Sequence, residues 1–282
     1  MLTLLSALLL SANAQYKFLP VRYDPWQAGK VLARVYPKQT LPDAFEIPAA
    51  DLPSATNQGQ RGTCAYFATV GIVEHYYGSK VKLSEECLVG VRNWMFDRGA
   101  KYAGNDQPNQ RPDPSGDFPS SIAQTIFNLG IPTAKNYPGV ADCRYDPSGG
   151  SALSLTKYQS VTAINGNDRG KGRAMDEITA PTIDKAKEMI SAGIPLVALV
   201  LIYERYQNDP KWYYSPAIDT DLVGGHAVML TGYQTRNGKT IFTFKNSWGG
   251  WWGNGGFGTL SEELLLHSWS FDPTYDYLAA FH

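Results

Sequence analysis

Hydrophobic positions in the first half of the chain follow a helical period. Three helices are expected from this pattern, at about 64–78, 84–97 and 119–129. The second has Ser84 as a good N-cap, with two glutamates in its first turn. The third is ended by Gly130 and Pro132. This half is therefore expected to be mostly helical.

The second half changes to short, branched apolar runs that are typical of strands. Strands are expected near 157–164, 196–202, 227–233, 241–245, 256–260 and 275–279. Asn237-Gly238, between two of these runs, predicts a tight hairpin. One helix is expected at about 182–192, and residues 98–116 and 165–172 are expected to be loops. The two halves together predict an α+β fold.

The N-terminus begins with an apolar run, MLTLLSALLLSANA, at residues 1–14. It is typical of a short secretory signal peptide, although it contains no Lys or Arg; the alternative is an apolar helix packed on the domain. The run is too short to span a bilayer, so a secreted protein without a stable membrane anchor is expected. Residues 15–40 contain three prolines and no steady period, and we expect a short arm or pro-segment there.

Composition narrows the function classes. The chain has 282 residues, of which 43% are hydrophobic and 18% charged, as in a globular protein. The net charge is −1 and no long basic run is present, so we expect no nucleic-acid partner. No Cys/His cluster has the spacing of a metal site, and we expect a monomer without metal or cofactor. In an oxidising compartment, three cysteines leave one thiol unpaired.

The stretch with the clearest chemistry is the Gly-rich loop that runs from Asn57 to Cys64 and into the first helix. A thiol at a helix start lies at the positive end of the helix dipole, which favours the thiolate. Gln58 could fold back over the loop and offer an N–H donor beside the sulfur. That is the layout of a nucleophile with an oxyanion site. A buried or disulfide-bonded cysteine on a capped helix would explain the stretch equally well.

A nucleophilic thiol needs a base, and four histidines are available. His75 would lie ~16 Å from Cys64 along the same helix, out of reach. Neither His267 nor His282 has a motif around it. His226 follows two glycines at the start of a buried strand, where its imidazole can be exposed. The alternative for His226 is a structural histidine with satisfied hydrogen bonds.

Asn246 could orient the imidazole of His226, because the predicted hairpin returns the chain toward it. Counting back from the two-residue turn, however, Asn246 falls opposite Met229. That is about three residues, or ~10 Å, from His226. A bulge or strand splay is needed to join them, and the residues alone leave this pairing open.

Three blocks, taken in chain order, resemble the signature blocks of papain-like cysteine peptidases. They are Asn57-Gln58-Gly59 with Gly62-Thr63-Cys64, then Gly225-His226-Ala227, then Lys245-Asn246-Ser247-Trp248-Gly249. The resemblance covers about 41–260. It implies a two-lobed papain-like fold, with a helical lobe at 41–145, an antiparallel β-rich lobe at 146–282 and the active cleft between them.

The resemblance also implies a role for each of five residues, and protein or peptide substrates. Cys64 is the nucleophile and His226 the acid and base. Gln58 and the backbone N–H of Cys64 bind the oxyanion. Asn246 orients the imidazole, and the indole of Trp248 shields the His–Asn contact from water. The implied reaction is peptide-bond hydrolysis through an acyl-enzyme.

Further positions are implied to contact the substrate: Gly116, Asp117, Pro119, Leu199, Gly225 and Ala227. Pro119, Leu199 and Ala227 match the family's second substrate pocket. All three are apolar, so a bulky apolar residue is expected two positions before the cleaved bond.

The chain also departs from the family pattern. Arg61 stands where the family usually has a disulfide cysteine, Ala65 replaces a tryptophan, and Asp117 replaces a glycine. Cys87 falls one helical turn before the expected cysteine, but it can still reach the sulfur that the family pairs with it, because one turn is only ~5.4 Å. The resemblance therefore implies a Cys87–Cys143 disulfide.

Three alternatives remain at this point. An inactive homologue that binds a peptide or a protein partner is favoured by Arg61, Ala65 and the short arm. A transglutaminase-like acyl-transfer enzyme would also use Cys and His, but such enzymes usually orient the histidine with Asp. A disulfide-bonded secreted binding domain would require Cys64 to be bridged.

Overall fold

The computed structural model describes residues 41–99, 111–134, 143, 153–163, 171, 175–178, 180–272 and 277–281. The expected signal peptide and arm lie outside these residues, as do His282 and most of the two long loops at 98–116 and 165–172.

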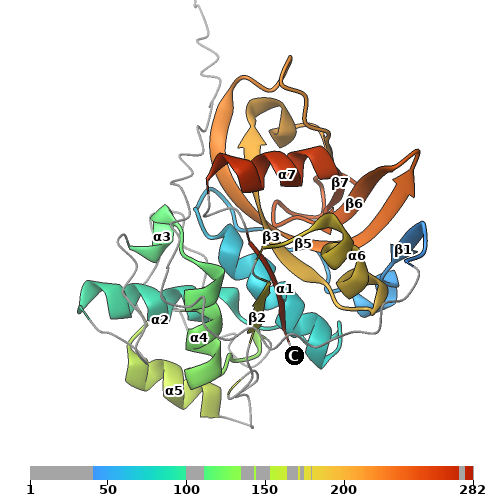
Figure 1. Cartoon of the computed structure of the whole chain (residues 1–282). Coiled ribbons are helices and arrows are strands. Elements are labelled where there is room, and N and C mark those ends of the chain that lie inside the picture. The colour runs from blue at the N-terminus through green and yellow to red at the C-terminus, as the bar shows by residue number, and fades with distance from the viewer. Residues whose placement is uncertain are drawn as a thin grey trace, which may run out of the picture.

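Three helices of the first half lie where the hydrophobic period predicts them: α1 (Cys64–Tyr77), α2 (Glu85–Asp97) and α4 (Pro119–Leu129). The short α3 (Pro112–Ser115) lies in the segment 98–116, which was expected to be a loop. The Ser84 hydroxyl caps α2 by accepting a hydrogen bond from the backbone N–H of Cys87. Figure 1 shows α2, α3 and α4 together on one side of the molecule, with α1 between them and the sheet.

Within the described residues, eight strands form one mixed, mostly antiparallel sheet. They are β1 (Ala44–Glu46), β2 (Met175–Ile178), β3 (Leu196–Tyr203), β4 (Lys211–Trp212), β5 (Leu222–Arg236), β6 (Lys239–Lys245), β7 (Phe257–Ser261) and β8 (Leu278–Phe281). Their order is β2-β8-β3-β5-β6-β7-β4, and β1 pairs with β5. Only the β4–β7 pairing is parallel among these strands. The group of α1 to α4 on one side and this sheet on the other confirm the expected α+β fold (Figure 1).

The strand expected near 157–164 is wrong, because this segment is the helix α5 (Leu155–Ala163). A short apolar run does not by itself distinguish a strand from a buried helix turn. Tertiary packing favours the helix here: Tyr158 is fully buried, and its hydroxyl donates a hydrogen bond to the Gly130 carbonyl at 2.7 Å. The segment is fixed by packing on the helical side.

Two further helices cover the sheet. The expected helix at 182–192 is present as α6 (Ile183–Ser191), with the Thr182 hydroxyl as its cap. The pattern missed α7 (Glu262–Phe271), although its start carries a clear signal: the Ser261 hydroxyl accepts from the Leu264 N–H, and two glutamates follow it.

A bulge interrupts the predicted hairpin between β5 and β6. Asn237 and Gly238 have φ values of 52° and 75°, as the tight turn requires. The register then shifts between Leu230 and Gly232, so that Met229 pairs with Lys245. The shift brings the end of β6 one residue closer to the start of β5 than an unbroken ladder would.

Candidate active site

The loop before α1 is a tight turn that delivers Cys64 to the first position of the helix. The Asn57 side chain accepts a hydrogen bond from the Gly59 N–H at 2.9 Å, and Gly59 has a positive φ of 65°. Cys64 is 5% exposed and begins α1. The thiol is therefore nearly buried at the positive end of the helix dipole.

Gln58 fastens this loop to the segment that follows β6. Its backbone N–H donates to the Ser247 carbonyl at 2.8 Å, and its side-chain Oε1 accepts from the Ser247 hydroxyl at 2.5 Å. Its Nε2 donates to the Arg61 carbonyl at 2.7 Å. The carboxamide is fully buried, and it folds back over the loop as the sequence suggested.

His226 and Asn246 form the pair that the strand count left open. His226 Nε2 lies 2.8 Å from Asn246 Oδ1. The same oxygen accepts a hydrogen bond from the Ser247 N–H at 2.8 Å, which holds the amide in place. The bulge after Leu230 reduces the expected offset of three residues between His226 and Asn246 by one. The two side chains span the distance that remains.

Cys64 lies against the strand that carries His226. Burial raises the pKa of the Cys64 thiol to about 11, and backbone hydrogen bonds from Ala227 and Ala65 oppose that shift. Burial also lowers the pKa of His226 to about 4, opposed by the hydrogen bond to Asn246. Burial thus favours the neutral thiol and the neutral imidazole in this closed arrangement.

Two indoles enclose the imidazole of His226. The ring of Trp248 lies 4.9 Å from it, centroid to centroid, and is 6% exposed. The ring of Trp212, which is fully buried, lies 5.9 Å from His226 and 5.6 Å from Trp248. The sequence pointed to Trp248 but gave no role to Trp212.

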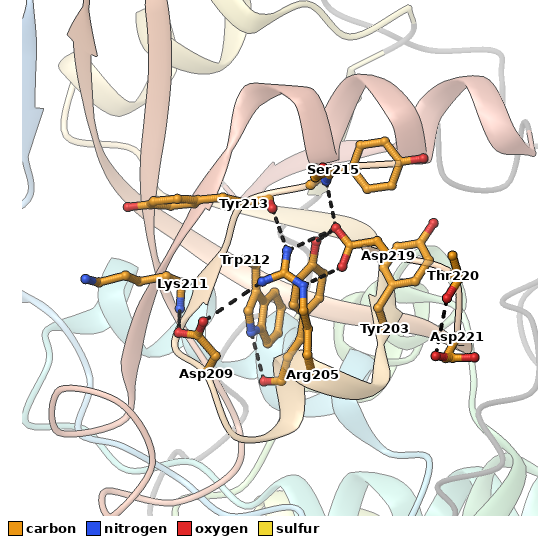
Figure 2. Close-up of polar contacts among 12 residues, drawn as sticks. Tyr203, Arg205, Asp209, Lys211, Trp212, Tyr213, Ser215, Asp219, Thr220 and Asp221 are labelled. Carbon is orange, nitrogen blue, oxygen red and sulfur yellow. Dashed lines mark hydrogen bonds and ion pairs between the residues drawn. The ribbon is translucent and has the colours of Figure 1, made fainter. Parts of the chain in front are cut away.

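Trp212 is carried by the segment 203–221, which Figure 2 shows in detail. Arg205 donates two hydrogen bonds to the Asp219 carboxylate, at 2.5 and 3.0 Å, and a third to the Tyr213 carbonyl at 2.6 Å. The Trp212 indole N–H donates to the Tyr206 carbonyl at 3.0 Å. These contacts fix the segment, and with it the indole beside His226.

Asp117 does not present its carboxylate to a substrate. Arg92 holds both carboxylate oxygens, at 2.9 and 3.1 Å, and the Tyr66 hydroxyl donates to one of them at 2.5 Å. The neighbouring Gly116 has a φ of 100°, and a Cβ there would lie 3.3 Å from the Gly62 carbonyl. Only the backbone of 116–117 is therefore left to meet a peptide.

The three residues expected to form an apolar pocket are well packed. Leu199 of β3 and Ala227 of β5 are cross-strand partners, and each is 1% exposed. Pro119 opens α4 and is buried. Gly225, also expected to contact the substrate, pairs with Leu201 on the same ladder.

Two of the three cysteines and the remaining described histidines have structural partners. Cys87 and Cys143 form the disulfide that the resemblance implied, and Cys64 is free. His75 lies in the last turn of α1, with its ring nitrogens 2.8 Å from the Asp51 carbonyl and 3.1 Å from the Gly193 carbonyl. His267 stacks on Tyr214 at 3.9 Å.

Within the described ranges, no group of three or more His, Cys, Asp or Glu side chains is arranged to hold a metal ion. No helix in the same part of the chain is long and apolar enough to cross a membrane.

Comparison with known proteins agrees with this geometry. The family model described as "Papain family cysteine protease" matches residues 41–264. The chain belongs to the papain family. Among its papain-family relatives, a digestive cysteine proteinase 2 of Homarus americanus is 27% identical over 243 residues, covering 80% of this chain and 64% of the relative. Pro-cathepsin H of Mus musculus is 28% identical over 209 residues, covering 71% of this chain and 54% of the relative.

Solved papain-family structures share the fold. Xylellain, a cysteine protease from Xylella fastidiosa, superposes with a TM-score of 0.64 at 18% identity, covering 94% of this chain and 95% of that one. A Carica candamarcensis cysteine protease in complex with E-64 has a TM-score of 0.56 at 19% identity, covering 85% of this chain and 97% of that one. The chain spans about half to two thirds of the length of the curated papain-family relatives described above.

Sequence reasoning gave no individual role to several residues that support this papain-family site: Arg92, Arg205, Trp212, Asp219, Lys245 and Ser247. One signal was available. Arg92 interrupts an otherwise apolar stretch of α2, and a lone charge there indicates a buried partner. The buried Lys245, which bonds the Thr56 hydroxyl at 3.2 Å, stands directly before Asn246. Its burial depends on packing between α1 and β6, which no local pattern reports.

Proposed function

We propose that this chain is a cysteine peptidase that cleaves peptide bonds with Cys64 and His226. The observation that supports this proposal is that residues from two distant parts of the chain meet in one site. Gln58 and Cys64 come from the loop before α1, whereas His226 and Asn246 come from β5 and the end of β6. The Gln58–Ser247 hydrogen bonds join the two parts directly.

Asn246 engages Nε2 of His226, so Nδ1 is the nitrogen that exchanges a proton with the Cys64 thiol. Burial opposes each charge taken alone. A thiolate and an imidazolium that face each other stabilise one another, and each offsets the desolvation of the other. The dipole of α1 adds to the stability of the thiolate.

The reaction then follows from these groups. The sulfur of Cys64 attacks the substrate carbonyl carbon, and the carbonyl π electrons move to oxygen. The second N–H of the Gln58 carboxamide and the Cys64 backbone N–H stabilise this oxyanion. His226 gives its proton to the leaving amine as the C–N bond breaks. His226 then takes a proton from water, and the resulting hydroxide attacks the thioester carbonyl. The C–S bond breaks, the carboxylic acid product leaves, and Cys64 thiolate and His226 imidazolium are restored.

Substrate preference is expected to follow the apolar character of Pro119, Leu199 and Ala227. If these residues line the pocket, a bulky apolar residue two positions before the cleaved bond binds best. A series of fluorogenic dipeptides measures this through kcat/KM. A clear preference for a charged residue there contradicts the pocket assignment.

An inactive homologue that binds peptide or a protein partner is the alternative. Its support is the burial of both reacting groups, since Cys64 is 5% and His226 0% exposed. An epoxide thiol inhibitor separates the two proposals, with mass spectrometry to locate the label. Labelling of wild type at Cys64, lost in Cys64→Ala, supports the peptidase. An unlabelled wild type that still binds peptide supports the alternative.

We further propose that the protein is secreted as a monomer after removal of residues 1–14. In this proposal, 41–145 form the helical lobe and 146–282 the β-rich lobe. The mass of the secreted chain reports the mature N-terminus, and light scattering reports the oligomeric state.

A further inference from the structure

Arg61 is a buried cation inside the catalytic loop. Its guanidinium is 2% exposed. One Nη donates to the Asp113 carboxylate at 2.9 Å, and the other bonds the Glu86 carboxylate. Glu86 lies in α2 and Asp113 in α3, so one side chain ties the loop to two helices.

The backbone of the same residue holds the oxyanion donor. The Arg61 carbonyl accepts the hydrogen bond from Gln58 Nε2 at 2.7 Å, and this fixes one of the two hydrogens of that amide. The direction of the remaining hydrogen follows from the first, because the amide group is planar. The Ser247 hydroxyl fixes the oxygen of the same amide, so a displacement of the Arg61 backbone removes one of the two contacts that orient the Gln58 carboxamide.

Asp113 is a firm anchor for this arrangement. Its side chain is completely buried, its N–H donates to the Asn93 side chain at 3.0 Å, and its carbonyl accepts from Arg111 at 2.7 Å. A buried guanidinium without its carboxylates would carry a large desolvation cost. The loop can therefore leave this position only by exposing Arg61 to water.

The segment near Asp113 also touches the loop through its backbone. Gly116 approaches the Gly62 carbonyl so closely that a Cβ there would lie 3.3 Å from it. The loop between Gln58 and Cys64 is thus fixed at Arg61 and Gly62 against the segment that is proposed to meet the substrate backbone.

We propose that Arg61 is a positioning residue for the oxyanion site: its ion pairs with Asp113 and Glu86 hold the loop so that Gln58 aims its free N–H at the reacting carbonyl. This inference rests on the proposed peptidase function. Arg61 itself does not touch the substrate. Its effect passes through Gln58, and this distinguishes it from a residue that only adds stability.

A double-mutant cycle tests this route with Arg61→Met, Gln58→Ala and the combined variant. Gln58→Ala removes one oxyanion donor and is expected to lower kcat by ~10²–10³-fold. Arg61→Met is expected to lower kcat by about 10- to 50-fold, with KM changed less than about threefold, since only transition-state binding is lost. The combined variant is expected to match Gln58→Ala within about twofold. If the two single effects multiply instead, Arg61 does not act through Gln58 and the proposal fails.

Lys185→Met is the control. Lys185 lies in α6 and pairs with Glu188 in a partly exposed ion pair that does not involve Asp113. Its kcat is expected to stay within about twofold of wild type, because a partly exposed ion pair contributes little. If Arg61→Met does not fold, Asp113→Asn weakens the same ion pair with almost no change of shape, and it enters the cycle in its place.

A second measurement does not depend on activity. Hydrogen–deuterium exchange over residues 57–63 is expected to speed up at least about tenfold in Arg61→Met and to be unchanged in Lys185→Met. Unchanged exchange in Arg61→Met overturns the positioning proposal even if the enzyme is active. Faster exchange in a chain whose wild type shows neither hydrolysis nor labelling of Cys64 supports the positioning of Gln58 and rejects the peptidase function.

Discussion

The two sides of the candidate site are held in place by different forces. On the helical side, buried charges fix loops: Arg61 pairs with Asp113 and Glu86, and Arg92 pairs with Asp117. On the sheet side, His226 lies in a strand whose ladder sets its place, and the rings of Trp212 and Trp248 pack around it.

The difference follows from what each backbone can do for itself. A strand satisfies its N–H and C=O groups along the ladder, so register alone places a side chain, and apolar packing is enough to hold it. The segments 57–63 and 111–118 have no ladder to fix them, and directional contacts from side chains take that role. The comparison predicts that the two sides respond differently to mutation.

The largest effect on activity is expected from His226, the residue of the sheet side that is proposed to act on the Cys64 thiol of the helical side. His226→Ala removes the proposed acid and base, and kcat/KM is expected to fall by ~10⁴-fold or more. Gln58 and Cys64 on the helical side are untouched, so the fold and the thiol remain. Fluorogenic peptide hydrolysis measures the loss, and unfolding in urea checks the fold. Near wild-type hydrolysis by this variant would show that the sheet side does not supply the base.

The next largest effect is expected from a buried charge on the helical side. Arg92→Met leaves the Asp117 carboxylate, which is 0% exposed, without its cation. The free energy of unfolding is expected to fall by about 3–5 kcal/mol, as when one partner of a buried pair is removed. Arg92→Met combined with Asp117→Asn is expected to recover more than half of that loss in urea unfolding. A double variant as unstable as Arg92→Met contradicts the ionic explanation.

Lys245 lies between the two sides and gives a prediction about pH. Burial lowers its pKa from 10.5 to about 8, opposed by Glu74 and Glu85. Between about pH 8 and 10.5 the unfolded chain binds more protons at this group, so the free energy of unfolding rises with pH. The rise attributable to Lys245 is expected to reach up to ~3 kcal/mol.

Lys245→Met provides the control for that prediction. Other groups titrate in the same window, so the comparison is the difference between wild type and this variant in urea unfolding from pH 7.5 to 10. The free energy of unfolding of wild type is expected to rise relative to that of Lys245→Met as the pH rises. A difference that does not change with pH shows that Lys245 keeps its charge through the window.

A smaller effect is expected from an aromatic contact on the sheet side. Trp212→Phe removes the hydrogen bond to the Tyr206 carbonyl and part of the packing against His226. The free energy of unfolding is expected to fall by about 2 kcal/mol, equally at pH 6 and pH 8, because no charge is involved. Trp251→Phe, at a 77% exposed indole, is the control and is expected to change stability by less than about 0.5 kcal/mol.

Much of the fold could be predicted from the chain alone. The spacing of apolar residues predicted α1, α2, α4 and α6, and the Asn237-Gly238 turn predicted the β5–β6 hairpin. The failures were mostly short segments: α5 was expected to be a strand, and α3, α7, β1, β2 and β4 were not expected at all. Short apolar runs do not carry enough periods to separate the two kinds of element, so packing decides them.

The sequence by itself determined which groups are present, because the blocks around Cys64, His226 and Asn246 are local and ordered along the chain. Only the tertiary structure decided how they meet. The bulge after Leu230 brought Asn246 within reach of His226, and the burial of Arg61 tied Gln58 to the helices. The physical reason is the sequence separation over which each kind of interaction acts. Caps, turns and helix faces depend on neighbours within a few residues, whereas register shifts and buried ion pairs depend on segments that approach only when the chain has folded.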